Sequence, residues 1–144
     1  MIYFRTSLIY MFIISFIIQY YIMSYIMTNN LNNINNSLSK FYVSTAMASM
    51  MGLTDMFTMG DQNTLVLFIL CVMLVGSVIM YRRQMYIYEK DYLQEMIEHH
   101  SMALLTSKSI IEKTNDNQVK NLAQNIIKSQ QSEINYMEQL LQKY

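Results

Sequence analysis

Residues 64–83 read TLVLFILCVMLVGSVIMYRR, and this stretch divides the chain into two chemically different regions. Its first eighteen residues carry no charge, and a helix of that length covers most of the roughly 30 Å hydrocarbon core of a bilayer. Of the charged side chains, only Arg5, Lys40, Asp55 and Asp61 precede the paired arginines, and all the others lie in residues 82–144. We therefore predict an all-α protein with a transmembrane region at 1–81 and a water-exposed helical region at 82–144.

Two earlier segments are also candidates for crossing a membrane. Residues 8–27 form an apolar run interrupted only by Ser15, Gln19, Ser24 and tyrosines, and the run lacks the small residues of a signal-peptide cleavage site. Residues 41–60, FYVSTAMASMMGLTDMFTMG, are long enough to span but contain several hydroxyl side chains and Asp55. We predict two to three transmembrane helices, at about 8–27, 41–60 and 64–81, joined by an Asn-rich loop at 28–40, in a multi-pass integral membrane protein.

The orientation of these spans in the membrane is left open by the sequence. Arg82 and Arg83 favour a cytoplasmic carboxyl-terminal half, because cytoplasmic flanks of transmembrane helices carry an excess of Lys and Arg. Arg5, beside the first span, favours the opposite orientation. The bilayer is therefore an expected partner, but the side that carries residues 82–144 is not determined.

Composition excludes several functional classes. The formal net charge is zero, so the chain lacks the clustered basic excess of a nucleic-acid-binding protein. The one cysteine, Cys71, excludes an internal disulfide framework and a Cys-rich zinc site. We find no phosphate-binding glycine loop, nucleophile–base pair or metalloprotease motif, and we expect no catalytic activity.

The charged region is predicted to be an antiparallel helical hairpin. Apolar residues recur at spacings of three and four on both sides of Thr114-Asn115-Asp116-Asn117, a stretch of good helix-capping residues. No Gly or Pro interrupts residues 82–113, so we expect the last span to continue into the first helix of the hairpin. Two helices cannot enclose a core, so the hairpin must dock on its own membrane region or build a four-helix bundle with a second copy, and we expect a homodimer or higher homo-oligomer.

The only two histidines, His99 and His100, are adjacent on the first helix of this hairpin. A turn centred between Asn115 and Asp116 places them opposite Gln130 and Glu133, with Met96 and Met137 about one turn away. Imidazole together with thioether favours Cu(I), whereas imidazole with carboxylate suits zinc, nickel or Cu(II). A core histidine that is hydrogen-bonded to Glu133 or Gln130 would have the same sequence pattern, and this alternative stays open.

Residues 92–103, YLQEMIEHHSMA, and 121–137, NLAQNIIKSQQSEINYM, resemble the domain-of-unknown-function family 305 (DUF305). The resemblance implies that 82–144 is a DUF305-like hairpin of ferritin-like, four-helix-bundle type, and some members of the family are associated with copper. Many members have Pro where this chain has Glu98, and some place membrane spans before the domain. Carried over by position, the implied metal ligands are His99, His100, Met96, Met102, Glu133 and Met137, with Gln130 and Glu98 beside them.

The sequence as a whole predicts an integral membrane protein whose His/Met hairpin binds a metal ion, with copper favoured, for sequestration or handling. The alternative is a non-catalytic structural or oligomerisation protein whose histidine pair is a hydrogen-bonded core feature. An oxidase with a carboxylate di-iron centre would need Glu three residues before a histidine, and positions 96 and 97 are Met and Ile.

Overall fold

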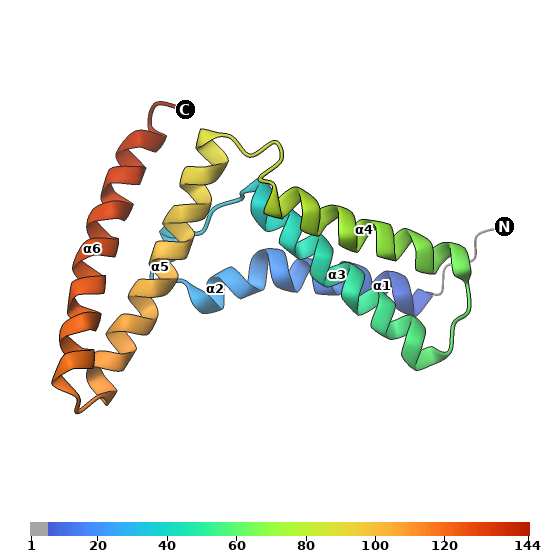
Figure 1. The fold of residues 1–144 in the computed structure, drawn as a ribbon, viewed down its shortest axis with the longest axis horizontal. Helices are drawn as coiled ribbons and strands as arrows, with labels where there is room; N and C mark the ends of the chain where they lie inside the picture. The colour runs from blue at the N-terminus through green and yellow to red at the C-terminus, as the bar shows by residue number, and fades with distance from the viewer. Residues whose placement is uncertain (1–5) are drawn as a thin grey trace. The chain divides into compact units, whose positions relative to one another are not determined.

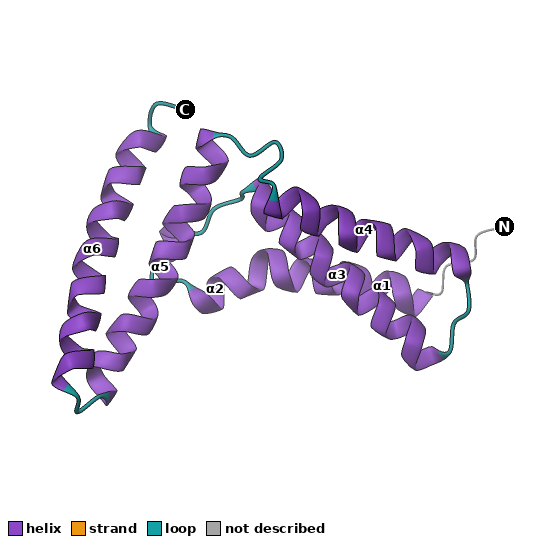
Figure 2. Ribbon diagram, in the orientation of Figure 1, coloured by secondary structure: helices purple, strands orange, loops and turns teal. Residues whose placement is uncertain are grey.

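The computed structural model describes residues 6–144, which are helical and contain no β-strand, as the sequence predicted (Figures 1 and 2). The chain forms two compact units. Unit 1 comprises the described residues up to Met23 together with Leu38–Tyr86, and unit 2 comprises Ser24–Ser37 and Ile87–Tyr144. The Asn-rich segment thus belongs to the same unit as the histidines.

Unit 1 is built from three antiparallel helical rods. The first rod consists of α1 (Thr6–Ile17), a π-helical turn (Ile18–Ile22) and α2 (Met23–Met27). The part of α2 beyond Met23 belongs to unit 2. The other two rods are α3 (Leu38–Met59) and α4 (Thr64–Arg82). The Ser7 hydroxyl donates to Asp55 (3.3 Å) and Phe16 lies edge-on to Phe41, so α1 and α3 run in opposite directions. The Tyr42 hydroxyl donates to the Met85 carbonyl (2.9 Å), which fixes α3 against the end of α4.

Two helices in the described part of the chain are long and apolar enough to cross a membrane, namely Thr6–Met27 and Thr64–Arg82. The 22-residue α3, which covers most of the predicted 41–60 span, is too polar to meet the same criterion. Its serine side chains, however, face inward: Ser39, Ser44 and Ser49 are fully buried. Apolar side chains of the same helix are exposed instead, among them Phe57 (81% exposed).

The expectation that α4 would continue into the next helix is wrong. Gln84 adopts a left-handed backbone conformation (φ 50°), and its N–H donates to the Tyr81 carbonyl while the Met85 N–H donates to the Met80 carbonyl. This pair of bonds is the Schellman pattern that closes a helix end, usually around a glycine. The sequence analysis missed the end of α4 because a non-glycine residue occupies the left-handed position.

Unit 2 contains the two longest helices, α5 (Glu89–Lys113) and α6 (Asn117–Leu141), which run antiparallel along each other (Figure 1). The Asp116 carboxylate accepts bonds from the Gln118 and Val119 N–H groups and caps α6, as the sequence of the turn predicted. An apolar cluster fills the seam between the two helices and consists of Leu93, Ile97, Leu104, Ile134 and Met137.

Candidate functional site

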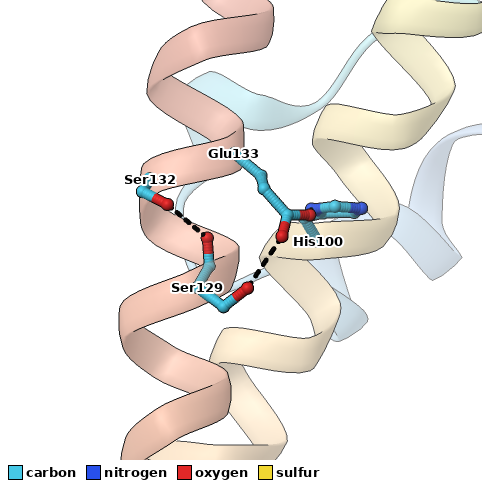
Figure 3. A network of polar contacts seen from close by, with 4 residues as sticks. All are labelled: His100, Ser129, Ser132 and Glu133. Carbon is cyan, nitrogen blue, oxygen red and sulfur yellow. Dashed lines mark hydrogen bonds and ion pairs between the residues drawn. The ribbon is translucent and has the colours of Figure 1, made fainter.

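His100 and Glu133 meet across the seam of α5 and α6. The His100 Nδ1 lies 3.2 Å from the Glu133 Oε2, close to the pairing that the turn position predicted. The other carboxylate oxygen of Glu133 accepts a bond from the Ser129 hydroxyl (2.7 Å), so the carboxylate sits between Ser129 and the imidazole (Figure 3). The His100 side chain is 14% exposed, whereas that of Glu133 is 49% exposed. The pair therefore occupies the solvent edge of the seam.

The His100 imidazole and the Glu133 carboxylate lie close together but do not form a hydrogen bond. The His100 Nδ1 is buried and has no hydrogen-bond partner, because its alignment with the carboxylate falls outside hydrogen-bond geometry. A buried polar nitrogen without a hydrogen-bond partner is uncommon in native structures. The His100 Nδ1 is therefore the atom of this pair whose hydrogen-bonding capacity is unused.

Met96 and Met137 lie on the same helix faces as this pair. Met96 precedes His100 by four residues and Met137 follows Glu133 by four, and such spacings place side chains on one face of a helix. Met137 is a member of the buried apolar cluster, and Met96 packs against that cluster. Two thioethers and one imidazole are thus presented from facing sides of one seam.

The other predicted site residues are placed differently. His99 is exposed, and a helix turns it about 100° away from its neighbour His100. Met102 is half-buried but stands about 200° around α5 from His100, so it does not share the seam face. Gln130 is half-buried on α6, one turn before Glu133. The structure brings together part of the predicted set and separates His99 and Met102 from it.

Glu98 holds the Asn-rich segment against α5. Both of its carboxylate oxygens accept bonds from that segment, one from the Ser24 hydroxyl and the other from the Asn35 N–H (3.0 Å). One turn further along, the fully buried Ser101 hydroxyl accepts bonds from the N–H groups of Asn29 (3.2 Å) and Asn30 (3.3 Å). Glu98 thus faces the segment and not the His100 seam.

Sequence reasoning missed the residues of this attachment. The sequence analysis places Ser24 in an apolar span and residues 28–40 in a loop between spans. The sequence offers one signal: Glu98 is an acidic residue that directly follows the apolar pair Met96-Ile97. Ser129 was also missed, although it lies four residues before Glu133 and such pairs interact on a helix surface.

The described residues contain no group of three or more His, Cys, Asp or Glu side chains that could hold a metal ion. His100 and Glu133 supply two such donors. The nearest soft donors on the same helix faces are the thioethers of Met96 and Met137.

Comparison with known proteins identifies the family of the carboxyl-terminal region. Uncharacterized protein L153 of Acanthamoeba polyphaga mimivirus is 52% identical over 60 residues, which cover 42% of this chain and 40% of L153. The chain therefore aligns with about two fifths of the length of this relative. No solved structure matches. The family described as "Domain of unknown function (DUF305)" matches residues 80–144. We refer to the matched residues 80–144 below as the DUF305 domain, after the family whose model they match.

Proposed function

We propose that this chain is a multi-pass integral membrane protein whose DUF305 domain binds Cu(I) at the α5–α6 seam, for sequestration or handling of the ion without catalytic turnover. The observation that carries the metal proposal is the buried, unpartnered Nδ1 of His100 on the same face as Met96 and beside the helix that carries Met137. Cu(I) is stable with few, soft ligands, and imidazole with thioethers is a donor set that selects it.

The proposal that this chain spans a membrane is supported by the hydrogen bonds of polar side chains in unit 1. Non-helical or unsatisfied backbone and polar groups are expensive in lipid. Apart from Ser39, whose buried hydroxyl has no hydrogen-bond partner, the α3 Ser and Thr hydroxyls donate to carbonyls of their own helix. Examples are Ser44 on the Lys40 carbonyl (2.8 Å) and Thr54 on the Met50 carbonyl (2.9 Å). The helix therefore suits a third crossing beside α1 and α4 despite its polar composition. Retention of the protein in the pellet after alkaline carbonate extraction of membranes would support this placement, and release into the supernatant would contradict it.

A harder divalent ion is a poorer match for this seam. Zinc and Cu(II) take three or four nitrogen, thiolate or carboxylate ligands, and the seam supplies only His100 and Glu133 of that kind. The bound Cu(I) would contribute a soft Lewis-acid centre held by His100 and the two methionines. The residues around it keep water out, since Leu93, Ile97 and Ile134 line the same seam.

The experiment that tests the metal site is a Cu(I) competition titration of the full chain in detergent against a chromogenic chelator. We expect one Cu(I) per chain, with affinity reduced at least about tenfold in His100→Ala and in Met96→Leu/Met137→Leu, because each removes a ligand from a three-donor set. His99→Ala and Met102→Leu are matched controls of the same residue types and should retain the affinity. Equal copper binding by the His100→Ala variant would contradict the proposal.

A second candidate function is self-association of the DUF305 domain into a four-helix bundle of ferritin-like type. The observation that favours it is an open pocket of about 250 Å³ at the loop end of the seam, which the two helices leave unfilled. Its walls are largely apolar and include Ile110, Val119, Leu122 and Ile126. Leu122 is 60% exposed and shares the pocket wall with Ile110 (39%) and Val119 (38%), and such clusters of exposed apolar side chains mark interaction sites.

Size-exclusion chromatography with light scattering separates this function from the first. We expect Leu122→Glu to convert a dimer into a monomer while leaving the Cu(I) titration unchanged. If the domain serves only as an oligomerisation module, wild-type protein will carry no copper and His100→Ala will alter assembly or stability alone. A monomeric wild-type protein would exclude the second candidate.

A further inference from the structure

In the described part of unit 1, the positively charged side chains lie at one end and the negatively charged side chains lie toward the other. Between residues 6 and 23 and between 38 and 86, the only charged residues are Lys40, Asp55, Asp61, Arg82 and Arg83. Lys40 lies at the start of α3, and Arg82 and Arg83 lie at the end of α4. Because α3 and α4 are antiparallel and Tyr42 bonds to Met85, these three cations share one end. The two acids lie toward the other end, near the loop that joins α3 to α4.

Aromatic side chains cluster at the cationic end. Phe16 stacks on Tyr20 with ring centroids 5.6 Å apart and meets Phe41 edge-on at 5.4 Å. The Lys40 ammonium lies 5.4 Å from the centroid of the Tyr20 ring. A membrane–water interface typically carries aromatic residues beside Lys and Arg. There the aromatic rings contact lipid while the charged groups contact lipid phosphates.

We propose that the end of unit 1 that carries Lys40, Arg82 and Arg83 binds the headgroups of anionic phospholipids and faces the cytoplasm. This inference rests on the membrane placement proposed above and is independent of copper. Each Lys or Arg near an anionic leaflet adds to the electrostatic attraction between protein and membrane surface. In the described part of unit 1, all three cations lie at this end and both acids lie toward the other.

The orientation of the DUF305 domain follows from chain connectivity. The chain leaves unit 1 after Met23, returns at Leu38 and leaves again after Tyr86. Leu38 and Tyr86 flank Lys40 and Arg83 in sequence, so these crossings lie at the cationic end. Unit 2 then emerges on the cytoplasmic side, and the α3–α4 loop with Asp61 and Gln62 lies on the other side.

Tryptophan fluorescence quenching provides a direct test of headgroup binding, because the chain contains no Trp. Phe41→Trp, at an exposed position of the aromatic cluster, reports on the cationic end, and Ile79→Trp on α4 is a second reporter should the first variant misfold. The full chain is reconstituted in vesicles in which either phosphatidylglycerol or phosphatidylcholine carries brominated acyl chains, at equal mole fraction. We expect brominated phosphatidylglycerol to quench more strongly, with a preference of at least about twofold that high salt reduces.

Two controls make the result specific. Phe57→Trp, at the acidic end and 81% exposed, should show no headgroup preference. In Lys40→Gln/Arg82→Gln/Arg83→Gln the preference at Phe41→Trp should fall to one. A preference of one with the natural charges, or an unchanged preference in the triple variant, would overturn the proposal. Absence of quenching by either lipid at every reporter would also remove the membrane placement, which separates the two failures.

Cysteine labelling in cells tests the orientation. In a Cys71→Ser background, Gln62→Cys should react with a membrane-impermeant maleimide added to intact spheroplasts. Asn121→Cys, on α6, should react only after permeabilisation. The reverse pattern, or equal reactivity of both positions before permeabilisation, would overturn the cytoplasmic assignment. Lys120→Glu/Lys128→Glu/Lys143→Glu, which alters three cations far from the spans, should leave the pattern unchanged.

Discussion

Units 1 and 2 each bury an apolar cluster, but they differ in the polar side chains that accompany it and in the side chains that face outward. In unit 1 the fully buried positions include Ser39, Ser44 and Ser49, while Phe57 and Phe68 are exposed. In unit 2 the α5–α6 seam is filled by Leu104 and Ile134, and charged side chains cover the outer faces. Apolar burial drives folding only where water is the competing solvent, whereas small and hydroxyl side chains permit close helix packing in lipid. The contrast indicates two environments for one chain.

The largest loss of stability is expected from a substitution in the α5–α6 seam of unit 2, and it tests whether this seam is a hydrophobic core. Leu104→Ala removes a side chain that is 1% exposed and should lower the free energy of unfolding of this unit by about 2–5 kcal/mol, because it leaves a cavity. Chemical denaturation of the full chain in detergent, followed by circular dichroism, measures the loss. Leu105→Ala, at the neighbouring leucine that is 37% exposed, is the matched control and should cost much less. Equal losses would mean that the seam is not a hydrophobic core.

In unit 1 the corresponding test concerns a close approach between helices. A Cβ added at Gly52 would lie 3.2 Å from both terminal methyl carbons of Leu70, which is itself buried in an apolar cluster and cannot easily move. Gly52→Val should therefore destabilise the α3–α4 packing by about 1–3 kcal/mol. Gly76→Val, where nothing lies within 4 Å, should be neutral. Thermal unfolding in detergent compares the two, and the reverse ranking would contradict the close approach.

Glu98 breaks the simple contrast, because it is a charged residue that unit 2 buries. Glu98→Ala removes the acceptor for Ser24 and Asn35 and should cost about 1–3 kcal/mol, since two donors lose their partner. Hydrogen exchange should rise in residues 24–37 and stay unchanged in α6. Glu138→Ala, at an exposed glutamate of α6, is the control. Unaltered exchange in the segment would show that other contacts hold it.

The smallest predicted effect has the opposite sign. Gln84 lies in the left-handed region, which costs a non-glycine residue about 1–2 kcal/mol. Gln84→Gly should therefore stabilise the link between the units by about 1 kcal/mol, whereas Gln139→Gly inside α6 should destabilise by a similar amount. Thermal unfolding resolves the difference in sign. A destabilised Gln84→Gly variant would mean that the glutamine side chain, which donates to the Tyr81 carbonyl, contributes more than the strain costs.

Much of the fold could be predicted because its signals are local. The charge-free run before Arg82, the capping residues at Asp116 and the helical spacing of apolar residues each act within a few turns. The facing of His100 and Glu133 followed from the same information, because the position of a turn fixes which residues of two antiparallel helices are level. The family resemblance added the histidine motif to this local information.

The candidate site was only partly predictable for a geometric reason. Adjacent residues on a helix point about 100° apart, so His99 and His100 could not both be assigned to one seam until the packed face of α5 was known. Met102 and Glu98 likewise lie on other faces of α5. Glu98 bonds to a segment that precedes it by more than sixty residues, and no local pattern encodes such a pairing.

By itself the sequence determined the all-α class, the two strongly apolar helices, the turn of the DUF305 domain and the level at which His100 meets Glu133. The periodicity of apolar residues, the length of uncharged runs and the placement of charges carry this information, because each of these signals is local in the sequence. Only the tertiary structure decided that α4 ends at Gln84, that α3 turns its serines inward and that residues 24–37 attach to Glu98 and Ser101. Those features depend on which helix faces meet, and side-chain packing between distant segments sets that choice.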